Sequence, residues 1–120
     1  MDKEKIKILI VRPGEEPEEA MIIESASSLQ DIVGGYFELV KPPIHTDDTK
    51  IICNEEGKLN GSEPNSPILD EFLNCYDILY GTIIICRHPV NSTELASLTD
   101  EQVERYKKIY SLTVRGMYVF

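Results

Sequence analysis

The alternation of apolar and polar residues is most informative between residues 27 and 40, where it predicts a helix followed by a strand. Ser27 and Gln30 have the spacing of a capping box at a helix N-terminus, and Gly34 suits the left-handed position that ends a helix. Three apolar residues at i, i+3 and i+4 form the inward stripe of the helix: Leu29, Ile32 and Val33. The run from Tyr36 to Val40 follows as a strand. Because a helix of about two turns is marginal alone in water, we expect it to lie on a sheet.

Longer apolar runs predict the middle of that sheet. Residues 5–12 become apolar on both faces, which is typical of an inner strand, and residues 77–87 contain a continuous β-branched run. We expect these two segments to be neighbouring central strands. Gly81 marks a bulge or a close approach of another backbone. A shorter strand is expected at residues 20–24.

A well-specified turn follows a short strand at residues 51–53. Residues 54–57 begin with Asn and end with Gly, as a type I turn prefers, so residues 58–60 are predicted to return as the partner strand. Residues 61–67 contain too many glycines and prolines for regular structure. Residues 68–76 have helical spacing only over a short window.

The second predicted helix spans residues 98–110 and has complete start signals. Thr99 and Gln102 form a capping box, and Leu98 can pack on Val103 as a hydrophobic staple. The ten residues after this helix alternate apolar and polar side chains, which favours an edge strand, a tail docked on a partner or a frayed end.

Together these elements predict an α+β fold with a mainly antiparallel sheet and two short helices packed on one face. A chain of 120 residues fits one domain. We assign residues 1–110 to a single α+β domain and residues 111–120 to a C-terminal tail or edge strand. This tail is also where we expect a homo-oligomer to form.

Charge and composition exclude several classes of function. The formal net charge is −9, and the first 100 residues hold 19 acidic against 8 basic residues, so we expect no direct binding to a nucleic-acid backbone. No apolar run approaches the ~20 residues of a membrane-spanning helix, and no signal peptide is recognisable. We therefore expect a cytoplasmic protein without a membrane partner, in which the three cysteines are free thiols.

The residues that usually carry catalysis or hold cofactors are not arranged in known patterns. No glycine-rich phosphate loop is present, and the cysteines and histidines lack the paired spacing of a zinc site. His45 with Asp47 and Asp48 resembles a base with its orienting carboxylate or half a metal site, but a surface loop is the favoured interpretation. We expect no catalytic residues, no metal and no cofactor, with a Cys/His enzyme as the alternative.

Polar residues in patterned turns are the candidate binding residues. The six positions are Gly35, Tyr36, Asn54, Lys58, Asn60 and Asn65. Asparagine side chains in the loop at residues 61–67 could instead brace that loop through hydrogen bonds to the backbone, and for this loop the bracing interpretation is favoured.

Four stretches together resemble one known family in the same order: SLQDIVGGYFELV, ICNEEGKLNG with the following Pro64 and Asn65, LYGTIII, and SLTDEQVERY. The family is classed only as domain of unknown function 3846. The resemblance runs from about Lys5 to Tyr110; the stretches PGEEPEEA and KPPIHTDD and the last ten residues depart from it. It implies a small protein carried by phages and plasmids of bacteria, and it supplies no catalytic residues.

The resulting hypothesis is a small acidic accessory protein that acts as a binding or regulatory module on a host or element-encoded protein. One alternative is an anti-defence protein that sequesters a nucleotide signal or mimics DNA. A nucleotide-binding site would require a cavity with cationic groups, for which Lys50, Lys58 and Arg87 are the candidates.

Overall fold

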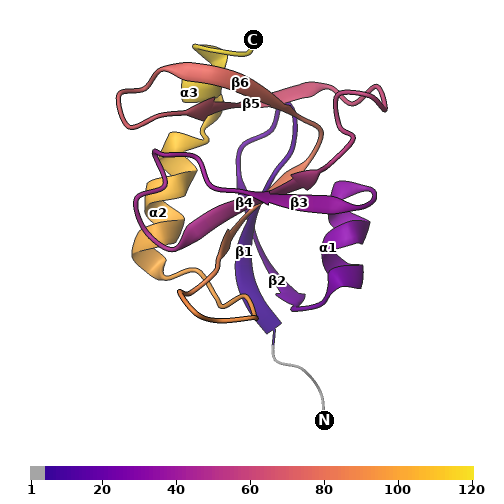
Figure 1. Cartoon of the computed structure of the whole chain (residues 1–120). Helices are drawn as coiled ribbons and strands as arrows, with labels where there is room; N and C mark the ends of the chain where they lie inside the picture. The colour runs from indigo at the N-terminus through magenta and orange to yellow at the C-terminus, as the bar shows by residue number, and fades with distance from the viewer. Residues whose placement is uncertain (1–4) are drawn as a thin grey trace.

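Residues 5–120 are described by this computed structural model, and they form a five-stranded sheet, a two-stranded hairpin and three helices (Figure 1). The elements in chain order are β1 (Lys5–Val11), β2 (Glu18–Ile23), α1 (Ala26–Val33), β3 (Phe37–Val40), β4 (Thr49–Asn54), β5 (Pro64–Leu69), β6 (Cys75–Tyr80), β7 (Ile83–Arg87), α2 (Asp100–Ile109) and α3 (Leu112–Gly116). The large sheet has the order β2-β1-β7-β4-β3, and all its neighbouring strands are antiparallel. None of the described helices is long and apolar enough to cross a membrane.

The strand β7 is the centre of the sheet. Its residues 83–86 are fully buried, so side chains cover it on both faces. β1 lies directly beside it, with Ile10 opposite Ile84. The predicted pairing of the two strongest apolar runs is therefore confirmed.

The central strands divide the interior into two apolar layers. Leu9 and Ile51 face the layer under α2, whereas Ile8 and Ile52 face the layer under α1. The α+β class and the mainly antiparallel sheet are confirmed, but the two helices cover opposite faces of the sheet instead of one. The reason is that the central strands carry apolar side chains on both faces, so each face needs its own cover.

The segment between β4 and β7 differs most from the expectation. Residues 58–60 continue the turn instead of forming a strand, and the expected loop at residues 61–67 contributes to β5. The run at residues 77–87 is divided at Gly81 into β6 and β7. Among the described residues β5 pairs with β6 alone, so its other edge makes no ladder hydrogen bonds and prolines are tolerated there.

The residues that begin and end the first two helices are those predicted, except for the N-cap of α1. Gly34 ends α1 with a left-handed backbone (φ 83°), and the capping box of Thr99 and Gln102 begins α2, both as predicted. However, α1 is capped by Ser25 rather than Ser27, because the helix already begins at Ala26 and the Ser25 side chain accepts from the Ser28 backbone N–H.

Residues 111–120 contain the short helix α3 instead of an edge strand, and this helix buries Arg115 completely. The guanidinium donates to backbone and amide oxygens of distant segments: Tyr110 O at 2.8 Å, Arg12 O at 3.0 Å, Asn65 Oδ1 at 2.7 Å, and Glu15 O. These bonds attach the C-terminal segment to the end of β1 and to the hairpin.

Asn65 is the second half of this contact and is also fully buried. Its Nδ2 donates to Val11 O (2.8 Å) and to Gly81 O (2.7 Å), and its Oδ1 accepts from Arg115. We refer to the two side chains as the Asn65–Arg115 node. The node joins the end of β1, the corner between β6 and β7, and α3.

We predict that Gly81→Ala destabilises the protein by roughly 1–2 kcal/mol, the cost of a left-handed backbone for a residue with a Cβ. Gly81 has φ 79°, and an added Cβ would lie 3.2 Å from Ser62. Gly116→Ala is the control, because a Cβ there meets open space. Urea unfolding measures the stability of both variants. Equal unfolding midpoints for the two variants would refute the strain at Gly81.

Candidate functional site

A cleft of about 420 Å³ lies where the β3–β4 side of the large sheet meets β6 of the hairpin. Its walls come from β3, β4, the turn at residues 54–59, β5 and β6. The Asn65–Arg115 node lies at the start of β5 and thus fixes the hairpin that forms one wall. We call this feature the acidic cleft, for the charges described below.

The candidate binding residues are only partly brought together. Asn54 and Lys58 line the acidic cleft. Gly35 is adjacent, because a Cβ there would lie 3.1 Å from Asn54 Nδ2, and Tyr36 is 74% exposed. Asn60 lies on the exposed turn outside the lining.

Asn65 cannot reach a ligand, because it is fully buried in the node; its selection as a binding residue is thus corrected. The other two asparagines also brace the backbone. Asn54 donates to Val33 O (3.1 Å) and accepts from the Glu56 N–H, and Asn60 accepts from the Ser62 N–H. All three asparagines thus bond to the backbone, but Asn65 bonds to remote segments rather than bracing its own loop.

The ionisable lining of the cleft is predominantly acidic. Lys58 forms an ion pair with Asp77 (2.5 Å), and the hydrogen bond between them raises the pKa of Lys58 and lowers that of Asp77. Glu38 and Glu55 add two further carboxylates to the same lining. Because only one of the three acids is matched by a lysine, the cleft attracts cations.

Cys53 is the thiol of the cleft. It is 2% exposed, and its Sγ lies 3.9 Å from Glu38 Oε1. Burial, followed by the neighbouring Glu38, raises the pKa of Cys53 to about 12. Burial likewise raises the pKa of Cys86 to about 12. Both groups are therefore protonated at neutral pH, which makes them poor nucleophiles.

Within residues 5–120, the strand β3 has no neighbouring strand on its outer edge, which lies beside the cleft. It is the last strand of the sheet, and the Glu55 N–H donates to Tyr36 O at 3.1 Å. Opposed residues in an antiparallel pair alternate between bonded and non-bonded positions. Because Tyr36 and Glu55 form a bonded pair, Phe37 and Leu39 occupy non-bonded positions in the observed register. Their backbone groups therefore point away from β4, toward solvent.

A buried polar network lies under the loop that connects β3 to β4, and the sequence did not predict it. His45 is 1% exposed instead of lying on a surface loop. Its Nε2 lies 2.7 Å from the Tyr110 hydroxyl, and its Nδ1 lies 3.1 Å from Thr49 Oγ1. The Thr49 hydroxyl donates its hydrogen to Asp47, so its oxygen accepts a hydrogen bond from His45 Nδ1. Since the proton of the neutral imidazole is then on Nδ1, His45 Nε2 accepts from the Tyr110 hydroxyl.

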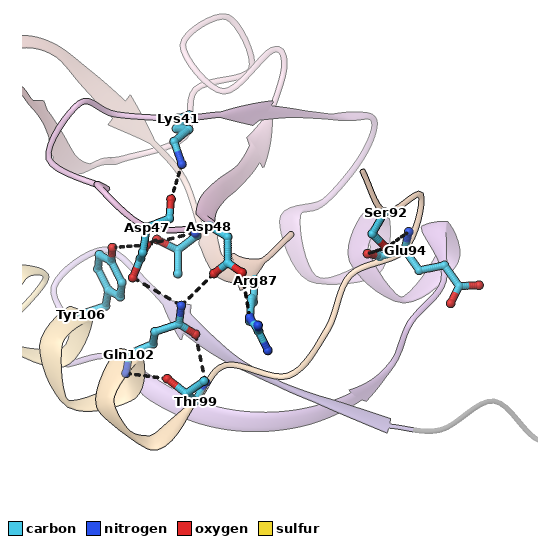
Figure 2. Close-up of polar contacts among 10 residues, drawn as sticks. Lys41, Asp47, Asp48, Arg87, Ser92, Glu94, Thr99, Gln102 and Tyr106 are labelled. Carbon is cyan, nitrogen blue, oxygen red and sulfur yellow. Dashed lines mark hydrogen bonds and ion pairs between the residues drawn. The ribbon is translucent and has the colours of Figure 1, made fainter. Parts of the chain in front are cut away.

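The network continues through two aspartates toward solvent (Figure 2). Asp47 accepts from the Tyr106 hydroxyl (2.8 Å), and Gln102 Nε2 donates to Asp48 (2.9 Å) and to Asp47 (3.3 Å). Burial alone would raise the pKa of Asp47, but these bonds and those from Thr49 outweigh it and lower the pKa to about 2. Arg87 pairs with Asp48 at 2.9 Å.

This arrangement holds the connecting loop on α2 and leaves His45 without access to a substrate. The signal in the sequence was the spacing of Tyr106 and Tyr110, which places two hydroxyls on the inward stripe of α2. Within residues 5–120, no three or more His, Cys, Asp or Glu side chains are grouped to hold a metal ion.

We predict that the free energy of unfolding decreases by roughly 1 kcal/mol between pH 7 and pH 5.5 because of His45. Burial lowers the pKa of His45 from 6.5 to about 4. Within that interval the unfolded chain binds a proton that the folded protein does not, so stability is complete above pH 6.5 and decreases as the pH falls toward 4. Urea unfolding at both pH values measures this slope. An equal slope in His45→Gln would assign the effect to another group.

Comparison with known proteins gives one result. A family model described as "Domain of unknown function (DUF3846)" matches residues 6–111. No curated protein and no solved structure matches the chain. The matched range includes both apolar layers and the acidic cleft, and it ends just before α3. The chain therefore belongs to the DUF3846 family, whose function is unknown.

Proposed function

We propose that the protein is a non-enzymatic binding module that captures an extended, basic segment of a partner protein along β3. The observation that carries this proposal is the position of a free strand edge beside a cleft whose lining has two carboxylates in excess of lysine. Addition of a strand to a sheet edge supplies affinity through the backbone, and the neighbouring side chains supply specificity.

The two faces of β3 would contact alternate side chains of such a segment. Glu38 and Val40 face the acidic cleft, where a lysine or arginine of the partner would meet Glu38 and Glu55. Leu39 is on the opposite face and is 43% exposed, so it offers an apolar contact to the next residue of the partner. The proposed segment thus alternates basic and apolar residues.

Charge supports a basic partner more generally. The chain carries a net charge of −9, and a field of this sign accelerates association with basic surfaces. The resemblance to a family of phage and plasmid proteins leads us to propose a host or element-encoded protein as the partner. The protonated, buried thiols of Cys53 and Cys86 and the enclosed imidazole of His45 support a role in binding rather than catalysis.

We predict that Leu39→Pro abolishes partner capture, whereas Leu39→Ala retains it. Proline removes the outward N–H of Leu39 but no hydrogen bond to β4, and the alanine control removes the same side chain while keeping that N–H. Capture is measured by pull-down from plasmid-bearing or phage-infected bacterial cells with mass spectrometry. Equal recovery of the same protein by both variants would refute strand addition at β3.

The contribution of charge to binding is tested separately, with the partner protein that the pull-down identifies. Glu38→Gln and Glu55→Gln should each weaken its binding about 2- to 5-fold at low salt, the range of an exposed ion pair. Asp70→Asn is the matched control, since Asp70 lies at the tip of the hairpin outside the cleft. Binding that is independent of salt and of both glutamates would exclude a basic segment.

A further inference from the structure

A second hollow lies on the α1 face of the sheet and consists of two adjoining parts that share His88. The first part, of about 310 Å³, is bounded by α1, β3, β4 and the loop after β7. The second, of about 530 Å³, is bounded by the loop between β3 and β4 and by the same loop after β7. We call the combined feature the lysine groove. The acidic cleft lies on the opposite, α2 face.

The first part of the groove is largely apolar. Its walls include five apolar side chains from three elements and the loop after β7: Leu29, Phe37, Leu39, Ile52 and Leu95. Glu24 is the one acidic residue of this lining among the described residues. A flat apolar group can therefore be buried here.

The second part of the groove is lined by two lysines, Lys41 and Lys50, and by two aspartates, Asp47 and Asp48. Lys50 Nζ lies 2.8 Å from His88 Nδ1, and Lys41 Nζ donates to the backbone oxygen of Asp47. Both acceptors are uncharged. Within residues 5–120 neither ammonium group forms an ion pair, although the chain has 21 acidic residues.

The nearby aspartates do not neutralise these lysines. The carboxylate of Asp47 accepts from Thr49, Tyr106 and Gln102, and that of Asp48 accepts from Gln102 and Arg87 (Figure 2). Both carboxylates are thus held by the polar network under the loop. The two lysines remain available to an anionic ligand group.

His88 fixes the boundary between the two parts. A lysine ammonium can only donate, so His88 accepts at Nδ1 from Lys50 and donates from Nε2 to Ser92 O at 2.8 Å. The ring is thereby held between a strand lysine and its own loop. The groove therefore has an apolar end and a polar end, and the polar end carries the two lysines together with Asp47 and Asp48.

We propose that the lysine groove binds a nucleoside monophosphate, with the base in the apolar part and the phosphate on Lys41 and Lys50. This ligand class unites a flat apolar ring and a compact anion, which match the apolar lining of the first part and the two lysines of the second part. The combined volume falls in the range typical of small-molecule sites. The site lies outside the acidic cleft, although it shares Leu39 of β3 with the proposed partner capture.

The test is isothermal titration calorimetry of the full chain with AMP, GMP, CMP and UMP, each compared with its nucleoside and with inorganic phosphate. We expect at least one nucleotide to bind about tenfold or more tightly than either fragment alone. Lys41→Gln and Lys50→Gln should each weaken that nucleotide about tenfold, the contribution of a charge-assisted hydrogen bond. Lys108→Gln is the matched control, because Lys108 is exposed on α2 outside both parts of the groove, and it should leave the affinity unchanged.

Three results would overturn the proposal. The first is no binding of any of the four nucleotides up to about 5 mM, a concentration at which even a site of millimolar affinity would be largely occupied. The second is binding of inorganic phosphate as tight as that of the nucleotide, and the third is an equal loss of affinity in Lys108→Gln. Backbone amide shifts in NMR spectra provide an independent readout, since they should cluster at Phe37, Leu39 and Leu95 rather than at the turn of residues 54–59.

Discussion

A buried guanidinium with no carboxylate partner among its contacts determines how the two parts of this protein are joined. Arg115 is fully buried, and its donors are satisfied by an amide oxygen and backbone carbonyls of distant segments. Burying a charge is costly unless every donor is matched, so the segments that supply these oxygens are confined to one arrangement. Asn65 is the acceptor that belongs to the hairpin.

The Asn65–Arg115 node determines the position of the hairpin. Asn65 also donates to the end of β1 and to the Gly81 corner, where β6 passes into the central strand β7. The node therefore sets where β6 lies relative to β3 and β4, and the space left between them is the acidic cleft. The lysine groove is bounded by α1, the large sheet and its loops, so it does not depend on the hairpin.

The sequence predicts the parts of the fold that depend on local or repeating patterns. The runs that form β1 and β7 contain enough β-branched residues to mark the centre of the sheet, and Thr99, Gln102 and Gly34 mark helix ends by contacts within a few residues. The prediction that both helices cover one face is wrong because β1, β4 and β7 together carry apolar side chains on both faces. Each face then needs its own helix.

The errors arise where the decisive contacts are remote in sequence. Asn65 stands among residues typical of loops, but its partners lie 54 and 50 residues away, and these contacts turn a binding candidate into a structural residue. His45 is buried by a tyrosine 65 residues away. Of the candidate binding residues, Lys58 and Asn54 line a cleft that the sequence did not predict, because β6, its second wall, was hidden inside a longer apolar run.

Hydrogen exchange of Arg115→Met, followed by mass spectrometry, tests the central claim most directly. Methionine fills the space but removes all the donors, so exchange should accelerate in β5, β6 and α3 while β1, β4 and β7 keep their protection. Unchanged protection of the hairpin, or an equal loss throughout the sheet, would contradict the claim that the Asn65–Arg115 node holds the hairpin on the large sheet.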